Sequence, residues 1–112
     1  MTAPFRAPCV FCEIIAGREP ADVWHEDERL IVFRNRLRWL PVMLLIVPRQ
    51  HKTQEQFWRE DMEEAAALAV EIGKKHTPGG FRLLSNFGHD ALQTVAHGHL
   101  HLLGGTPMGV YV

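Results

Sequence analysis

The chain has 112 residues, of which 46% are hydrophobic and 22% charged, and its formal net charge is −1. This length predicts a single domain over residues 1–112, and the apolar fraction argues against intrinsic disorder. The near-neutral charge argues against a broad nucleic-acid-binding surface, and no apolar run reaches the roughly 20 residues that a membrane span needs. Because no signal peptide is visible and two cysteines cannot build a disulfide scaffold, we expect a cytoplasmic protein.

The first half of the chain is expected to form a short helix followed by three strands. The segment Phe11–Ala16 is mostly apolar, and the glycine and proline that follow limit it to a brief helix. Asp22–Glu26 and Arg29–Phe33 are extended runs separated by two acidic residues, which predicts a β-hairpin. Leu40–Val47 is rich in aliphatic residues and stops at a proline, a pattern typical of a buried strand.

A long helix is predicted over Thr53–Lys75. Thr53 and Gln56 form the T-x-x-Q pattern of a capping box, and apolar residues recur at helical spacing along one face. That face consists of Trp58, Met62, Ala65, Ala69 and Ile72. Acidic residues crowd the first half of the helix and two lysines close it, which agrees with the direction of the helix dipole.

Two further strands complete the predicted fold. Phe81–Asn86 and Ala96–Leu103 have the composition of strands and are joined by an irregular loop over Phe87–Val95. The sequence therefore predicts an α+β domain with about five strands, one long helix and one short helix.

Histidine is the unusual feature of the composition, since the chain has seven and three of them are regularly spaced near the C-terminus. In a strand over His97, His99 and His101, the three imidazoles would lie on one face, about 6–7 Å apart. Leu100 and Leu102 would point to the core on the other face. Aligned imidazoles can bind a metal, or they can carry out nucleophilic and phosphate-binding chemistry. The alternative is a solvated histidine-rich strand, which the strict spacing disfavours.

The segment HGHLHLL at residues 97–103 resembles the signature of the histidine-triad (HIT) family, in which H-x-H-x-H precedes two apolar residues. Three more motifs in matching order support the resemblance: CVFCEIIAG at residues 9–17, IVPRQH at residues 46–51, and an asparagine and a Gln-Thr pair before the triad. The resemblance covers residues 9–105 and is closest to the HINT-like branch, in a bacterial form with an N-terminal C-x2-C. It implies a HIT-like fold with an antiparallel sheet, and a homodimer with one continuous sheet.

HIT proteins are nucleotide hydrolases or transferases, so the resemblance implies roles for single residues. His99 would attack the α-phosphorus of a nucleotide and form a nucleotidyl-imidazole intermediate, while His101 would donate to the phosphate oxygens. The implied substrates are purine nucleoside phosphoramidates, adenylylated compounds or dinucleoside polyphosphates. The implied substrate-binding residues are Asn86, Gln93 and Thr94 at the phosphate or leaving group, Phe11, Ile14 and Phe33 at the base, and Asn35 at the ribose.

Several positions depart from the family pattern. Asn35 stands where HIT proteins have an aspartate, so the charge-assisted contact to the ribose is lost. Met43 stands where a histidine usually backs the triad, and Leu92 stands where a glycine usually lets the backbone approach the phosphate. Without the resemblance, the apolar Phe11 and Phe33 would be assigned to the core.

The C-x2-C motif supplies two thiols at a spacing suited to one tetrahedral metal ion. The resemblance to bacterial HIT proteins implies that His51 and His97 complete this site with Cys9 and Cys12, which gives a closed structural zinc site. The alternatives are reduced thiols packed as small hydrophobic groups, and a redox dithiol. No thioredoxin-like βαβ pattern follows the motif, which weakens the redox alternative.

Three functional hypotheses follow for a purine nucleotide ligand. The first is a nucleotide hydrolase or transferase with a covalent intermediate on His99. The second is a nucleotide-binding regulatory module with weak or no catalysis, which the departures at Asn35, Met43 and Leu92 favour. The third is a zinc-dependent hydrolase that uses the triad itself as metal ligands.

Overall fold

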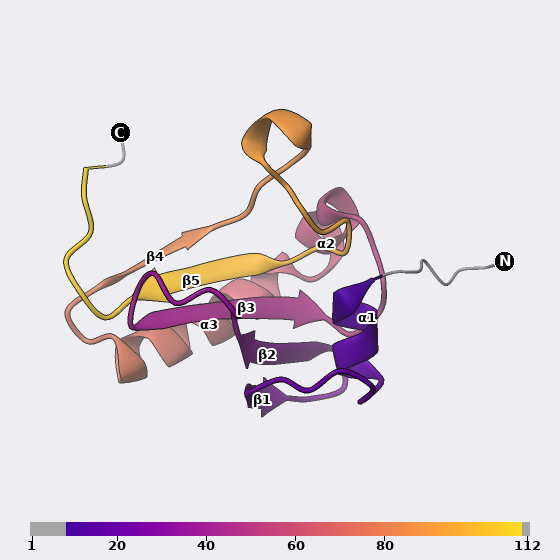
Figure 1. Ribbon diagram of the computed structural model, residues 1–112, viewed down its shortest axis with the longest axis horizontal. Coiled ribbons are helices and arrows are strands. Elements are labelled where there is room, and N and C mark those ends of the chain that lie inside the picture. Colours follow the sequence, from indigo (N-terminus) through magenta and orange to yellow (C-terminus); the bar gives the residue numbers. More distant parts are fainter. Residues whose placement is uncertain (1–8, 111–112) are drawn as a thin grey trace, which may run out of the picture.

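The computed structural model describes residues 9–110 and contains one five-stranded antiparallel sheet in the order β1-β2-β3-β5-β4 (Figure 1). The strands are β1 Val23–Glu26, β2 Leu30–Arg34, β3 Val42–Pro48, β4 Phe81–Leu84 and β5 Leu100–Gly104. The helices are α1 Val10–Ile15, α2 Gln54–Glu60 and α3 Met62–His76, with a 3-10 turn, η1, at His89–Ala91. The predicted α+β fold is confirmed. Of the helices in the described part of the chain, none has the length and apolar character needed to cross a membrane.

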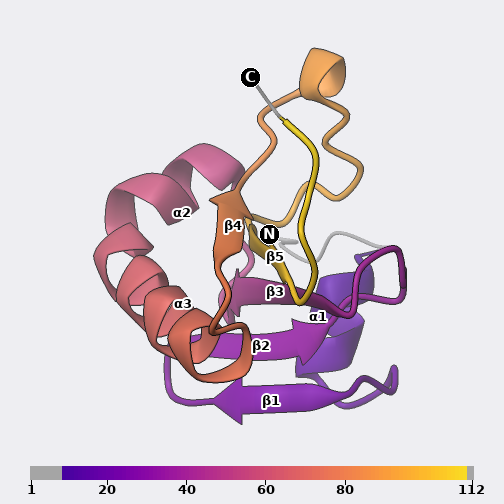
Figure 2. The same cartoon turned by 90° about the vertical axis from the view of Figure 1, so that its left-hand side faces the viewer.

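Helices lie on both faces of the sheet. Figure 2 shows α2 and α3 on one side and α1 on the other. The core under α2 and α3 is made of Leu30, Val32, Leu44, Ile46, Phe57, Ala65, Ala69, Leu100 and Leu102. The core under α1 is made of Cys9, Phe11, Ile31, Phe33, Leu45 and Val47. The alternation along β2 and β3 therefore divides the apolar residues between the two faces, as a sheet buried on both sides requires.

The strand that carries the triad is shorter than predicted. It begins at Leu100, so His97 and His99 precede the regular ladder. The backbone amide of Gly98 donates to the Lys52 carbonyl at 2.9 Å, and that of His99 donates to the Gln54 side chain at 2.8 Å. These two amides therefore donate hydrogen bonds to the segment at the start of α2 and not to a neighbouring strand. Leu100 and Leu102 point to the core under α2 and α3, as predicted.

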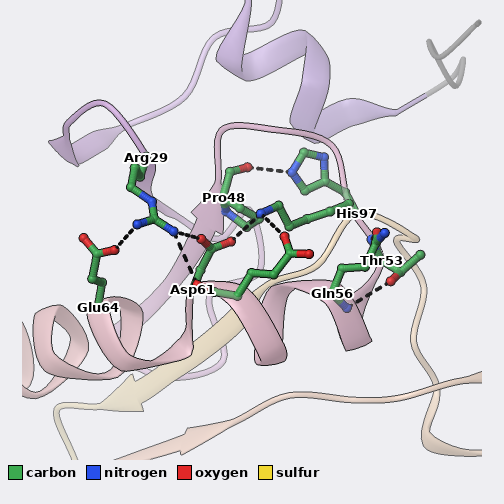
Figure 3. Close-up of polar contacts among 9 residues, drawn as sticks. Arg29, Pro48, Thr53, Gln56, Asp61, Glu64 and His97 are labelled. Atoms are coloured by element: carbon green, nitrogen blue, oxygen red, sulfur yellow. Dashed lines mark hydrogen bonds and ion pairs between the residues drawn. The ribbon is translucent and has the colours of Figure 1, made fainter.

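The predicted long helix is divided in two at Asp61. Asp61 has φ −124° and ψ −5°, which ends α2, and α3 starts at the next residue. The Asp61 carboxylate is buried and accepts hydrogen bonds from Lys52 Nζ at 2.8 Å and from the Arg29 guanidinium (Figure 3). The helix is interrupted at Asp61, where the side chain turns toward Arg29 and Lys52.

The break also changes which residues pack against the sheet. Met62, Ala65, Ala69 and Ile72 face the core as predicted, but Trp58 is 41% exposed. The neighbouring Phe57 is fully buried in its place. The predicted capping box at Thr53 and Gln56 is present, with both reciprocal hydrogen bonds formed (Figure 3).

Candidate active site and metal centre

The backbone of His99 is held on two sides by side chains. Gln54 accepts from the His99 amide at 2.8 Å and donates to the carbonyl of Asn86 at 2.9 Å. Ser85 donates its hydroxyl to the His99 carbonyl at 2.7 Å. Gln54 is buried, although a glutamine in the first turn of a helix has the sequence character of an exposed residue. Sequence reasoning therefore missed this support of the triad.

The ring of His99 has one fixed hydrogen bond. Its Nδ1 lies 2.7 Å from the carbonyl oxygen of His97, which can only accept, so Nδ1 carries the proton. Burial lowers the pKa of His99 below its ordinary value, although the hydrogen bond to His97 opposes this shift, and the ring is neutral at pH 7. The neutral ring therefore has its lone pair on Nε2, which is the form of imidazole that can act as a nucleophile.

His101 lies next to His99 on the same face of the sheet. The two ring centroids are 5.1 Å apart with an interplanar angle of 70°, somewhat closer than the strand rise alone predicts. Burial, and then the proximity of His99, lower the pKa of His101 to about 4. His101 is thus neutral at pH 7 and can offer one ring N–H to an oxygen atom.

A cavity of about 620 Å³ lies beside these two histidines, a volume typical of small-ligand sites. It brings together most of the candidate residues: Phe11, Ile14, Phe33, Asn35, Thr94, His99 and His101. The rings of Phe11 and Phe33 are 5.5 Å apart, and both residues are also buried in the core under α1. Both interpretations of these phenylalanines hold, because they form the core and the cavity wall at once.

Two candidate residues do not line this cavity. Asn86 contributes its backbone carbonyl to Gln54, and its side chain is not part of the cavity wall. Gln93 accepts from the amide of Gly88 at 2.8 Å and donates to the carbonyl of Val95 at 3.0 Å, so its amide stabilises its own loop. Their proposed contacts with substrate are therefore not supported by the cavity as it stands.

Three arginines in the cavity wall were missed by the sequence reasoning. Arg34, Arg36 and Arg38 come from the end of β2 and the loop after it. The pattern RNRLR at residues 34–38 could have indicated them, since an arginine recurs at every second position.

The two cysteines and two of the histidines gather at a separate point. The ligand atoms of Cys9, Cys12, His51 and His97 all lie within 4.8 Å of one another. The Cys12 Sγ is 3.1 Å from His51 Nδ1 and 3.6 Å from His97 Nδ1, and the Cys9 Sγ is 3.7 Å from His97 Nδ1. Sulfur and nitrogen ligands of one tetrahedral zinc ion are about 3.5 Å apart, so this cluster could hold a metal ion.

The surroundings of the cluster also suit a metal ion. The Nε2 of His97 donates to the Pro48 carbonyl at 2.7 Å, which leaves Nδ1 as the ligand atom (Figure 3). Burial lowers the pKa of His97 to about 4, which keeps the ring neutral. Without a cation, burial and the neighbouring Cys9 raise the pKa of Cys12 to about 12. A bound cation would favour the thiolates, because they are the form that binds metal.

The three triad histidines do not form one ligand set. Among the described residues, His97 groups with the two cysteines, whereas His99 and His101 belong to no cluster of metal-ligating side chains. This arrangement does not favour a metal bound by the whole triad.

A match to a known protein family covers most of the chain. The model of the HIT domain matches residues 16–108 of the chain. The chain belongs to the HIT family. Its solved relatives include a HIT family hydrolase from Clostridium thermocellum, with 33% identity and a TM-score of 0.86, for which the match covers 96% of this chain and 99% of that chain.

Two other solved HIT structures are informative about ligands. A hypothetical histidine triad nucleotide-binding protein from Sulfolobus tokodaii has 27% identity and a TM-score of 0.76, and the match covers 86% of this chain and 68% of that one. A Zn-bound histidine triad family protein from Mycobacterium smegmatis has 26% identity and a TM-score of 0.69, and the match covers 87% of this chain and 74% of that one.

In the loop before the triad of this HIT chain, Leu92 adopts a backbone conformation that favours glycine. Leu92 has φ 63° and ψ 40°, the left-handed region, in which Leu92 is the only non-glycine residue among residues 9–110. Its side chain is 77% exposed. Leucine is strained in this conformation by roughly 1 kcal/mol.

Proposed function

We propose that the protein is a nucleotide hydrolase or nucleotidyl transferase that acts on the α-phosphate of a purine nucleotide through His99. The observation that carries this proposal is the hydrogen bond from His99 Nδ1 to the His97 carbonyl, which leaves an unprotonated Nε2 on a ring that lines the cavity. The hydrolase from Clostridium thermocellum and the nucleotide-binding protein from Sulfolobus tokodaii support the reaction type and the ligand class.

The reaction would proceed in two displacements. The Nε2 of His99 attacks the α-phosphorus of a nucleoside phosphoramidate, a P–N bond to His99 forms, and the bond to the leaving amine breaks. The amine takes a proton from solvent. Water then attacks the same phosphorus, so that a P–O bond forms, the P–N bond to His99 breaks and the water gives one proton to solvent; the nucleotide leaves and neutral His99 is restored. The N–H of His101 would donate to a phosphoryl oxygen and stabilise the negative charge there.

The rest of the cavity would orient the nucleotide. Phe11, Ile14 and Phe33 offer an apolar surface to the purine base, and Thr94 offers a hydroxyl near the histidines. Because His101 is neutral, its N–H would bind the phosphate as an uncharged hydrogen-bond donor, whereas the only N–H of neutral His99 is already bonded to the His97 carbonyl. Adenylylated compounds and dinucleoside polyphosphates carry the same α-phosphate and remain alternative substrates within this proposal.

We also propose that Cys9, Cys12, His51 and His97 bind a structural zinc ion. The Cys2His2 donor set, its spacing and the Zn-bound relative from Mycobacterium smegmatis support this assignment. When bound, zinc would cross-link α1 to the segment that follows β3, through His51, and to the segment that precedes β5, through His97. A homodimer is proposed on the family resemblance, and a cytoplasmic location on the two free cysteines.

The test of the catalytic proposal is His99→Ala, with adenosine 5′-phosphoramidate as substrate. We expect kcat to fall by at least about 1,000-fold, since the nucleophile is lost. The control is His25→Ala, because His25 pairs with Asp27 at 2.7 Å, both partly exposed, and does not line the cavity. A full rate in the His99 variant would exclude the covalent mechanism.

The second candidate is a nucleotide-binding module without useful catalysis. The amide of Asn35 favours it, because Asn35 lines the cavity and departs there from the family pattern, and the strained Leu92 is a second departure in the loop before the triad. Calorimetric binding of AMP by the unmodified protein, without turnover of the phosphoramidate, would establish this candidate and overturn the enzyme proposal.

A further inference from the structure

The loop after β2 places a strong positive charge in the cavity wall. Arg34, Arg36 and Arg38 all line the cavity, and the acidic side chain in the same wall is Asp22. Arg36 forms an ion pair with Glu19. Arg34 pairs with the core residue Leu44, so its side chain leaves the sheet on the face under α2 and α3, and it donates to the Pro41 carbonyl at 3.3 Å. Arg38 donates to the backbone carbonyls of Asn35 and Leu37, and within residues 9–110 its guanidinium is not paired with a carboxylate.

Asn35 adds a donor to this wall. Its Oδ1 already accepts from the amide of Leu37 at 2.9 Å, so the polar atom left for a ligand is the donor Nδ2. An aspartate at this position would have offered a second acceptor to a ribose hydroxyl. This part of the wall therefore presents side-chain donors, and a group with several acceptor oxygens and negative charge complements it.

The sheet register gives the distance between this wall and the histidines. Phe33 pairs with Leu45, and Leu45 pairs with His101, so the three lie in one row across the sheet. Asn35 lies two residues further along. From the usual strand spacing and rise, the Cα atoms of Asn35 and His101 are about 12 Å apart. With the reach of the two sets of side chains, this separation accommodates one nucleoside.

We propose that Asn35 and Arg38, in the cavity wall, bind a second phosphate of the substrate, a phosphomonoester on the 2′ or 3′ position of the ribose. This inference rests on the proposed function, in which His99 and His101 hold the first phosphate. Planar guanidinium groups match phosphate with paired hydrogen bonds, and dinucleotide-binding sites likewise use an acid for a free ribose hydroxyl and an arginine for a ribose phosphate.

Calorimetry of the full chain with three probes tests the inference: AMP, adenosine 2′,5′-bisphosphate and adenosine 3′,5′-bisphosphate. We expect one bisphosphate to bind at least about tenfold more tightly than AMP at low ionic strength, since two charge-assisted contacts are added. The preferred isomer identifies the position of the phosphate. The preference should shrink as salt is raised, because Arg38 is exposed.

The variant Arg38→Gln should bring the ratio of the dissociation constants of AMP and the preferred bisphosphate close to one. Arg59→Gln is the matched control, because Arg59 pairs with Glu55 on the exposed side of α2 and should keep the ratio. Circular dichroism and thermal melting check that each variant folds. Equal affinity for AMP and both bisphosphates would overturn this inference alone, as would an unchanged ratio in Arg38→Gln. Failure to bind any of the three would overturn the proposed function as well.

Discussion

Gly98 is the point at which the triad passes closest to the first turn of α2. A Cβ at this position would lie 2.7 Å from the Cβ of Phe57 and 3.1 Å from the carbonyl oxygen of Thr53. The Gly98 amide is also fixed by the Lys52 carbonyl at 2.9 Å. Only a glycine therefore lets the flanking residues take their places, with His97 at the thiols and His99 at the cavity.

Gly98→Ala should damage stability and catalysis together. The methyl group has to displace either Phe57, which is fully buried, or the backbone of Thr53, and such overpacking costs about 1–3 kcal/mol of the free energy of unfolding. The accompanying shift of His99 should lower kcat. Denaturant unfolding and turnover of the phosphoramidate measure the two effects. Gly79→Ala is the control, since no heavy atom lies within 4 Å of a Cβ there.

For single residues, the sequence could predict which side chains are candidates for catalysis and metal binding, but not which neighbouring side chains hold them in position. The triad and the two cysteines form short motifs that are visible in the chain, and the family resemblance linked them to His51. Gln54, which holds the backbone of His99, is 45 residues away from it and belongs to no motif. The same limitation applies to the loop amide of Gln93, whose partners Gly88 and Val95 depend on a turn that the sequence alone does not define.

At the junction between α2 and α3, Asp61 forms ion pairs with Arg29 and Lys52 that the sequence pattern does not predict. Asp61 stands in an acidic stretch that has the pattern of a solvated helix face, yet its side chain is 3% exposed. Its partners Arg29 and Lys52 come from the start of β2 and from the segment before α2. Since neither partner is on the helix, helical periodicity predicted an unbroken Thr53–Lys75 helix and assigned Trp58 to the core.

Asp61→Asn should destabilise the protein in a pH-dependent way. Burial raises the pKa of Asp61, but hydrogen bonds from Lys52 and Arg29 outweigh it and hold the pKa below the ordinary 3.8. The carboxylate therefore stabilises the fold above about pH 4, and this contribution is lost as the pH falls through the folded pKa. We expect a loss of about 2 kcal/mol at pH 7, less than for a fully buried pair because Arg29 is half exposed.

Chemical denaturation of wild type and Asp61→Asn between pH 7 and pH 3 measures this effect. The difference in the free energy of unfolding should shrink toward the acidic end. Glu55→Gln provides the control, because the exposed pair of Glu55 with Arg59 contributes little at any pH in this range. A difference that stays constant with pH would show that Asp61 acts through packing instead of charge.

In the molecule as a whole, one face of the sheet forms the apolar core and the other carries the candidate sites. The face under α2 and α3 is an apolar core, whereas the face under α1 carries the cavity and the Cys/His cluster. Helix α1 belongs to both sites, since Cys12 is in the cluster while Phe11 and Ile14 line the cavity. A net charge of −1 gave no indication of the arginines in the cavity wall, because a whole-chain sum hides local asymmetry.

This arrangement predicts that metal binding and the cavity are coupled. A zinc ion held by Cys9, Cys12, His51 and His97 would fix α1 against the segments that follow β3 and precede β5. Removal of zinc with a chelator should lower the melting temperature and weaken the binding of AMP, because the wall made by Phe11 and Ile14 loses its anchor. Elemental analysis should find one zinc per chain, and readdition of zinc should restore both properties.

Cys12→Ser should reproduce the chelated state and no longer respond to zinc, whereas His89→Ala, at a fully exposed side chain, should behave as wild type. The affinity for zinc should rise with pH, because the metal must displace the proton from a thiol whose pKa burial, together with the hydrogen bond and charge of Cys9, raises to about 12 without the ion. If Cys12→Ser kept its melting temperature and neither variant nor wild type bound zinc, the cluster would be a group of packed thiols and imidazoles, and α1 would be held by its apolar contacts alone.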